Sequence, residues 1–454
     1  MPLNPSSLTS DLIEQYSSYL RSRFHFRDAD LRAQFAKALG GDRPLHAGPY
    51  LEVLPAFRAA RSIRELSADG VLAPEFLKLA PKAADIERPL YLHQEEAITK
   101  IQDGRNVVVA TGTGSGKTET YLLPIISHLF ETLSAGPRRP AVRALLVYPM
   151  NALANDQLRR IRQLLADVPS LTFGRYTGET PQTKDKGEAR FRQMWPHEPV
   201  LRNELKSREE MWAAPPDILI TNFAMLEYLL VRPQEAVFFA PGTAEFLRFL
   251  VFDEVHTYDG AKGCEIAMLL RRLKHRIGAT ERGRLRCIAT SATLGGGKDF
   301  PDVAAFAEQL FDEPFEWGDR ASRHDVVQAH RVEYVEPART WCPESSLYQR
   351  LADALTSSDP GAALLRTCRA TRLPTDVVDE ALRALDVEDG ADAAASDQES
   401  ADDEWGWGTP AAARKEAAPA DAAHINRALH VLLQGDERIV RLRRACDKGA
   451  RPIN

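Results

Sequence analysis

The sequence predicts an α/β protein in which a parallel sheet is covered by helices on both faces. Short β-rich runs alternate with helical segments between residues 86 and 315, a pattern typical of parallel, doubly wound sheets. One run leads through a glycine-rich loop straight into a helix, as in phosphate-binding proteins of this class. The runs span residues 106–111, 144–149, 171–178, 217–222, 249–254 and 286–293.

Composition and patterning divide the chain into five regions. Residues 1–85 predict a helical accessory leader, since "SDLIEQYSSYLRSRF" has helix-spaced apolar positions after a Ser/Asp cap. Residues 86–315 hold the predicted sheet, and residues 316–385 read as mixed and then helical. The Ala/Asp/Glu/Pro-rich stretch 386–422 is too polar and small to form a core, so we expect a disordered linker. Residues 423–454 predict one amphipathic helix or two short ones.

Charge and composition indicate a soluble protein whose negative net charge does not exclude binding to nucleic acid. The formal net charge is −6, but residues 386–404 carry nine acids and no Lys or Arg, and without them the charge becomes +3. A phosphate-binding track is therefore not excluded. No apolar stretch has membrane-spanning length and the N-terminus lacks a signal pattern, so we expect a cytoplasmic protein with no membrane partner.

The cysteines do not suggest a metal site or a disulfide framework. The five of them are scattered, and none forms a C-x-x-C pair. We interpret them as small buried hydrophobes.

The glycine-rich loop lies in "VVVATGTGSGKTETYLLPII" at 107–126. Backbone N–H groups of such a loop can surround a phosphate chain, and the N-terminus of the next helix adds partial positive charge. Lys117 would reach the β- and γ-phosphates of ATP, and the Thr118 hydroxyl would ligate Mg²⁺. Thr111 stands where the strict pattern has glycine. The predicted nucleotide-binding residues are Thr111, Gly112, Thr113, Gly114, Ser115, Gly116, Lys117 and Thr118.

An acid pair follows the strand run "FLVFDE". Asp253 at the strand end can hold Mg²⁺, and Glu254 can orient and deprotonate a water that attacks the γ-phosphorus. An acid pair alone also marks many solvated strand ends. In an open parallel sheet, however, ligands bind outside the carboxyl ends of the strands, where both this pair and the loop are expected. We therefore predict that Asp253, Glu254 and Lys117 are catalytic.

With these motifs in place, the chain resembles superfamily 2 helicases of the DEAD/DEAH type. The family's motifs are resembled, in order, by "RPLYLHQEEAI" (88–98), the glycine-rich loop, "VYPMNALANDQ" (147–157), "RYTGET" (175–180), "PDILITNFAMLEYLL" (216–230), "DEVH" (253–256) and "TSATL" (290–294). The resemblance implies a RecA-like P-loop NTPase domain over 86–315. It also implies that Gln94 reads adenine, and that His256 links the acid pair to Ser291 and Thr293, which couple nucleotide state to nucleic acid.

More narrowly, "TNFAMLEYLLVRP" and "DEVHTYDGAKGCEIAMLLRRLK" resemble large bacterial DNA helicases related to MrfA-type repair enzymes. Members of that group also occur in phage defence. Asp259 stands where a basic residue would be expected after Tyr258, which puts a DNA contact there in doubt.

A nucleic-acid surface is predicted from the loops that follow strands. Their backbone N–H groups and hydroxyls can donate to phosphate oxygens without reading sequence. Ordinary turn and cap roles are the alternative for each residue. Basic residues between 184 and 208 could line the approach of the nucleic acid, but acids are interspersed among them, which favours a solvated helical face. The candidates are Asn151, Thr177, Gly178, Thr221 and Asn222.

The resemblance implies a second RecA-like domain that supplies arginine fingers, and no Q-x-x-G-R-x-x-R-like motif follows residue 300. Loss of such a finger costs about 10³–10⁵ in phosphoryl-transfer rate. We expect the second domain in a missing part or in a separate chain, so that this chain is a fragment, a truncated frame or half of a split helicase.

The sequence thus predicts the ATP-binding half of an ATP-dependent helicase or translocase acting on DNA, with RNA not excluded. The alternative is a non-catalytic, nucleotide-gated interaction module of a repair or defence complex. A P-loop kinase or GTPase is disfavoured, because the Q-motif, DEVH and TSAT occur together. Polarity, pathway and oligomeric state are left open.

Overall fold

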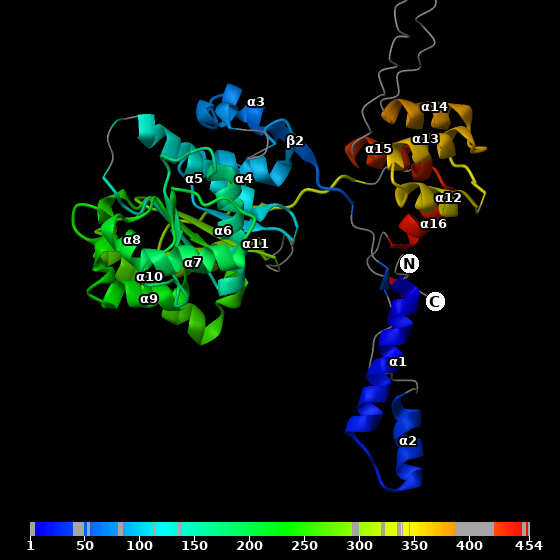
Figure 1. Cartoon of the computed structure of the whole chain (residues 1–454), viewed down its shortest axis with the longest axis horizontal. Helices are drawn as coiled ribbons and strands as arrows, with labels where there is room; N and C mark the ends of the chain where they lie inside the picture. The colour runs from blue at the N-terminus through cyan, green and yellow to red at the C-terminus, as the bar shows by residue number, and fades with distance from the viewer. Residues whose placement is uncertain are drawn as a thin grey trace, which may run out of the picture. The chain divides into compact units, whose positions relative to one another are not determined.

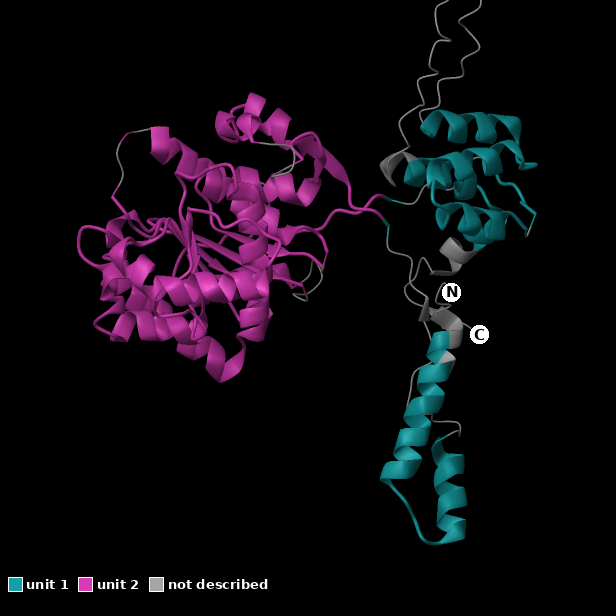
Figure 2. Ribbon diagram, viewed as in Figure 1, with its two compact units in different colours: residues 1–55, 333–454 teal, residues 56–332 magenta. Residues whose placement is uncertain are grey.

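The computed structural model describes most of the chain, which forms two compact units (Figure 2). One unit comprises residues 56–332, and the other comprises residues 1–55 with 333–454. Two predicted site residues, Thr113 and Thr293, lie outside the described residues. So does the predicted linker 386–422, except for its last residue. The described residues are 5–39, 50–51, 55–79, 85–112, 114–134, 136, 139–292, 299–318, 323–333, 337, 339–344, 346–385, 422–446 and 451–452.

The larger unit is built on one eight-stranded sheet whose neighbouring strands are all parallel. The strand order is β11-β4-β10-β9-β5-β8-β6-β7. The six predicted runs each contain a strand of this sheet, and the sheet also has two short strands, β7 and β11, that the sequence did not indicate. The strands are β4 (Val107–Ala110), β5 (Ala144–Tyr148), β6 (Phe173–Arg175), β7 (Glu204–Leu205), β8 (Ile218–Asn222), β9 (Phe249–Phe252), β10 (Arg286–Ser291) and β11 (Val326–Gln328).

Each face of the sheet has its own apolar core, because successive side chains of a strand point to opposite faces. In β4, Val107 and Val109 pack into one core and Val108 into the other. The first core includes α4 (Leu92–Gln102), α5 (Lys117–Ser134) and α6 (Asn151–Leu165). The second includes α9 (Phe223–Val231), α10 (Gly260–Arg276) and α11 (Phe300–Phe311). Figure 1 shows these helices around the sheet. The predicted fold class is confirmed.

The boundaries of this unit differ from the predicted 86–315. It begins earlier because β2 (Ala59–Ser62) pairs with β3 (Pro89–Tyr91). It ends later because β11 adds to the sheet beside β4. The leader prediction therefore divides between the two units. The remaining elements here are α3 (Ile63–Ala68), η1 (Pro74–Lys78), α7 (Lys184–Met194), α8 (Arg208–Ala213), η2 (Glu235–Phe239), η3 (Ala244–Phe246) and η4 (Val255–Thr257).

The second unit is mainly helical in its described residues. A small core of Leu351, Leu364, Ala428 and Leu432 joins the helices on either side of the residues that are not described. The described part of its final segment contains two helices, which is one of the two predicted alternatives. The elements are α1 (Pro5–Arg23), α2 (Ala29–Leu39), β1 (Tyr50–Leu51), α12 (Ser346–Leu355), α13 (Pro360–Arg369), α14 (Thr375–Ala384), α15 (Ala422–Gln434), α16 (Glu437–Cys446) and β12 (Arg451–Pro452).

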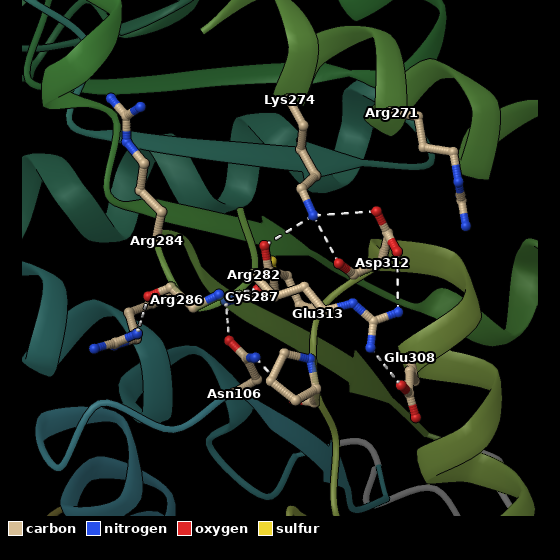
Figure 3. A network of polar contacts seen from close by, with 12 residues as sticks. Asn106, Arg271, Lys274, Arg282, Arg284, Arg286, Cys287, Glu308, Asp312 and Glu313 are labelled. Atoms are coloured by element: carbon tan, nitrogen blue, oxygen red, sulfur yellow. Dashed lines mark hydrogen bonds and ion pairs between the residues drawn. The ribbon is translucent and has the colours of Figure 1, made fainter. Parts of the chain in front are cut away.

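A buried polar network joins α10 to the end of α11, at the sheet edge where β4 and β10 begin (Figure 3). The Lys274 ammonium lies 2.9 Å from a carboxylate oxygen of Glu313 and donates to the Asp312 carbonyl at 2.6 Å. Glu313 is fully buried and also accepts from the Gly283 N–H. Asn106 bridges the Cys287 N–H and the Pro314 carbonyl. These contacts tie the turn before β10 to the segment after α11.

Candidate active site

The glycine-rich loop connects β4 to α5 at the carboxyl edge of the sheet. Gly114 and Gly116 have φ of +76° and +74°, a left-handed conformation that favours glycine. The hydroxyls of Thr111 and Ser115 are buried and 2.6 Å apart, which closes the loop across its base. Lys117 and Thr118 begin the helix, as predicted for a phosphate-binding loop.

Two consecutive side chains of α4 hold the backbone of this loop. His93 Nε2 lies 2.8 Å from the Ser115 carbonyl, and because a carbonyl only accepts, Nε2 carries the proton. Gln94 Nε2 donates to the Gly116 carbonyl at 2.9 Å, while its Oε1 accepts from the Tyr91 N–H. The family resemblance implies that Gln94 reads adenine, and it gives no role to His93. The signal available was a second polar side chain directly before Gln94.

Burial dominates the protonation state of His93. Desolvation lowers the pKa of His93, and the bond to Ser115 opposes the shift only in part. Its Nδ1 is buried with no hydrogen-bond partner among the described residues. The imidazole is therefore neutral near pH 7 and donates one hydrogen bond to the loop.

The acid pair follows β9, the neighbour of β10. Asp253 is only 7% exposed, and burial raises the pKa of its carboxyl, opposed by a hydrogen bond from the Thr290 hydroxyl. Glu254 has φ of +52°, a left-handed conformation unusual for a residue with a side chain. The same Thr290 hydroxyl accepts from the Glu254 N–H at 3.2 Å. Thr290, which sequence analysis missed, thus orients both acids.

The structure brings the loop and the acid pair together. Lys117 Nζ donates to Glu254 Oε1 at 3.0 Å, and the other carboxylate oxygen of Glu254 accepts from the Ala292 N–H. His256 Nδ1 lies 3.0 Å from the Ser291 hydroxyl and 3.3 Å from Glu254 Oε2. His256 and Ser291 are thus in contact, and Thr293, the other residue of the predicted coupling, lies outside the described residues.

The residues predicted to hold Mg²⁺ are oxygen donors of the type this ion prefers. Mg²⁺ is usually held by one or two carboxylates together with substrate phosphates, rather than by a cage of protein ligands. Burial raises the pKa of Asp253 because it disfavours the charged carboxylate, and a cation bound beside it would stabilise that charge. The donor set therefore fits Mg²⁺. The Thr118 hydroxyl accepts from Arg160 of α6 at 2.9 Å, a contact that sequence analysis missed. No cluster of three or more His, Cys, Asp or Glu side chains suited to a metal occurs in the described residues.

The predicted nucleic-acid residues lie near one another at the carboxyl edge but differ in exposure. Asn222 caps α9 by accepting from the Met225 N–H, and it donates to Asn151 Oδ1 at 2.8 Å. Thr177 and Thr221 are fully buried, and the Thr221 hydroxyl donates to a backbone carbonyl of the interior. Gly178 is exposed. The hydroxyls of the two threonines are therefore not presented to solvent, whereas the Asn151–Asn222 pair and the Gly178 backbone lie at or near the surface.

The basic residues between 184 and 208 do not share one helical face. The helix α7 ends at Met194, and Lys206 follows β7, with its ammonium bound to the Leu201 and Glu204 carbonyls. Its side chain is only 8% exposed. The interpretation as a solvated helical face therefore does not hold for Lys206, because the short strand β7 interrupts the segment.

Comparison with known families identifies the larger unit. Residues 91–299 match the DEAD/DEAH box helicase family, and this range includes both the loop and the acid pair. The chain carries a DEAD/DEAH box helicase domain. The predicted DEAD/DEAH box domain is confirmed for this range.

Relatives of the helicase domain include much longer proteins. Druantia protein DruE of Escherichia coli (strain UMEA 4076-1) is 32% identical over 66% of this chain and 21% of its own length. The uncharacterized ATP-dependent helicase YprA of Bacillus subtilis (strain 168) is 30% identical over 53% of this chain and 27% of its own length. A crystal structure of the DUF1998 helicase MrfA bound to DNA covers 62% of this chain and 30% of MrfA, at 24% identity and a TM-score of 0.42.

The chain therefore spans less than a third of the length of each of these proteins. Within the described helices, none combines the length and the apolar character that crossing a bilayer requires.

Proposed function

We propose that the chain is the ATP-binding half of an ATP-dependent DNA helicase or translocase, which hydrolyses ATP to ADP and phosphate when a second RecA-like domain completes the site. The observation that carries this proposal is the 3.0 Å ion pair between Lys117 and Glu254. It joins the phosphate-binding loop to the acid that activates water in such enzymes. Both groups are largely buried, as a water-excluding active site requires.

In this proposal Lys117 and Glu254 exchange partners when nucleotide binds. Lys117 turns from the carboxylate to the β- and γ-phosphates, and Glu254 becomes free to accept a proton from the attacking water. The Ala292 N–H keeps one oxygen of Glu254 in place during this exchange. Thr118 and Asp253 would hold Mg²⁺, which neutralises phosphate charge when bound.

The nucleic-acid part of the proposal rests on the carboxyl edge beyond the ATP site. Asn151, Gly178 and Asn222 would contact the sugar-phosphate backbone, which gives binding without sequence preference. The His256–Ser291 contact would transmit nucleotide state toward that edge. Among the relatives, YprA is an ATP-dependent helicase, which supports helicase chemistry for the domain that the two chains share.

A second candidate is a nucleotide-gated interaction module that binds ATP without turnover. It is favoured by the Lys117–Glu254 pair itself, which occupies both catalytic groups. The two candidates differ in one measurable property, since only the first predicts DNA-stimulated hydrolysis when a second RecA-like chain is added.

Titration of a fluorescent ATP analogue into wild type and Lys117→Ala tests the nucleotide site. We expect binding in the wild type and at least about tenfold weaker binding in Lys117→Ala, because a charge-assisted phosphate contact is lost. Lys186→Ala, an exposed lysine on α7, is the matched control and should bind like wild type. Equal and negligible binding by wild type and Lys117→Ala would falsify both candidates.

A further inference from the structure

Just beyond the end of β6, Glu179 lies in a ring of three donor side chains: Asn151, Arg175 and Arg190. Its carboxylate accepts from Asn151 Nδ2 at 3.2 Å and from an Arg190 guanidinium nitrogen at 3.0 Å. A nitrogen of Arg175 lies 3.7 Å from the same carboxylate. These donors come from α6, α7 and the last residue of β6. Three separate elements thus converge on one carboxylate.

The ring carries more positive charge than Glu179 neutralises. Two guanidinium groups face one carboxylate, and Arg175 is only 9% exposed. Burial lowers the pKa of Arg175, and the nearby Glu179 opposes this shift. Arg190 also donates to the backbone carbonyl of Glu179, which anchors its guanidinium at this position when the carboxylate moves.

The Glu179 side chain is accessible to solvent on one side. Its side chain is 43% exposed, and an exposed ion pair contributes little to stability because water screens it. Its backbone neighbour, Gly178, is exposed and has open space where a Cβ would be. A rotation of the Glu179 side chain into solvent would free the donors of Asn151 and Arg190. Arg175 would keep its hydrogen bond to Asn155 Oδ1.

We propose that Glu179 occupies the position of a backbone phosphate of the bound nucleic-acid strand, and that strand binding displaces it. A carboxylate and a phosphodiester both present two oxygens and one negative charge, so guanidinium and amide donors that hold one can hold the other. This inference rests on the proposed function, since Asn151 belongs to the predicted nucleic-acid edge. It adds a specific anion site and a residue that competes for it.

Competition by Glu179 lowers the affinity for nucleic acid and makes it depend on the geometry of the strand. A phosphate that binds the ring must displace the Glu179 carboxylate. Because Glu179 belongs to the same chain, its local concentration at the ring is always high. A nucleic-acid strand that also contacts neighbouring backbone donors has enough binding energy to displace the carboxylate. An isolated anion makes fewer contacts and displaces it less readily. Glu179 therefore suppresses weak, single-contact binding.

The test is the affinity of the full chain for a labelled single-stranded DNA, measured by fluorescence anisotropy at two salt concentrations. We expect Glu179→Gln to bind about three- to tenfold more tightly than wild type, with a smaller gain at high salt. Asp185→Asn removes the same charge from the first turn of α7 without touching the ring. Its gain should be clearly smaller.

Arg190→Gln completes the test. It should weaken DNA binding, and Glu179→Gln added to it should gain less than in the wild-type background, because the two side chains act on the same phosphate. Single-stranded RNA of the same length, run in parallel, tests whether the site depends on the 2′-hydroxyl.

Equal gains for Glu179→Gln and Asp185→Asn would reduce the effect to long-range charge and overturn the inference, as would unchanged or weaker binding by Glu179→Gln. Both of these outcomes leave the proposed function standing. If wild type and all variants bind no DNA while ATP binding is intact, the nucleic-acid part of the proposed function fails together with the inference.

Discussion

The ammonium of Lys117 and the carboxylate of Glu254 lie 3.0 Å apart, although 137 residues separate them in the chain. Each is the group that the proposed reaction needs free: one for phosphate, the other for water. Their pairing holds both in position before nucleotide binds. In the proposed reaction, nucleotide phosphates would therefore compete with Glu254 for Lys117.

Replacing Glu254 with glutamine should separate binding from turnover. Glu254→Gln removes the charge that pairs with Lys117, so we expect ATP to bind as tightly as to wild type or more tightly. Hydrolysis should fall by about 10²–10⁴, the usual contribution of a general base. Nucleotide titration and phosphate release, with single-stranded DNA and a second RecA-like chain present, measure the two effects.

The control for that experiment is Glu227→Gln, an exposed acid on α9 whose ion-pair partner is Arg272. It should leave both quantities unchanged. Hydrolysis by Glu254→Gln at the wild-type rate would contradict the assignment of Glu254 as base.

Asp253→Asn should stabilise the protein at neutral pH. Burial raises the pKa of Asp253, so its contribution to stability is full below its unfolded pKa and is lost as pH rises through its folded pKa. Near pH 7 the ionised carboxylate is destabilising, and the neutral amide avoids that cost. We expect a thermal midpoint a few degrees above wild type at pH 7, with the difference shrinking toward acid pH.

Mg²⁺ with ATP provides the second readout for Asp253. A ligand that binds only the folded state raises its stability, so Mg²⁺–ATP should raise the midpoint of wild type more than that of Asp253→Asn. A thermal midpoint for Asp253→Asn below that of wild type at pH 7 and at acid pH would contradict the prediction. It would show that the hydrogen bond from Thr290 stabilises the carboxylate more than its desolvation destabilises it.

His93→Gln should remove part of the acid sensitivity of the protein, because glutamine does not titrate. The pKa of His93 is lowered, so its contribution to stability is present above the unfolded pKa and lost as pH falls through the folded pKa. Between pH 7 and pH 5, the urea midpoint of the variant should therefore fall less than that of wild type. ATP affinity should stay close to that of wild type, because the glutamine amide can donate to the Ser115 carbonyl in place of Nε2.

His197→Gln is the matched variant for His93, because His197 is an exposed histidine with the same substitution. Its pH profile and ATP affinity should follow wild type. Identical pH profiles for wild type and His93→Gln would remove His93 as the source of the acid sensitivity.

The buried Lys274–Glu313 pair should be costly to break from one side. Lys274→Met leaves the fully buried Glu313 carboxylate without its cation, which typically costs about 3–5 kcal/mol. Urea unfolding measures this loss. Lys274→Met combined with Glu313→Leu should recover part of it, since no unpaired charge then remains.

Arg282→Ala, which breaks only exposed ion pairs to Glu308 and Asp312 in the same network, should have a small effect on unfolding (Figure 3). A loss in Lys274→Met no larger than that in Arg282→Ala would contradict the burial argument.

Much of the sheet and of the nucleotide site was predictable because its signals are local. Each predicted run is a contiguous apolar stretch that forms a buried strand, and the glycines, Lys117 and Thr118 follow one another along the chain. Sheet topology then places the ends of parallel strands at one edge, so the approach of Asp253 and Glu254 to the loop follows from the class of fold. The strands β7 and β11 were missed because two or three residues carry no readable period.

The sequence by itself determined which chemical groups the helicase domain has: a glycine-rich loop with Lys117, an acid pair and a histidine that follows it. Only the tertiary structure decided which of them are paired, buried or free. Thr290 between the two acids, His93 on the loop and Arg190 on Glu179 are contacts across many residues. Such contacts depend on how helices and strands pack in three dimensions, and the local order of residues carries no record of that packing.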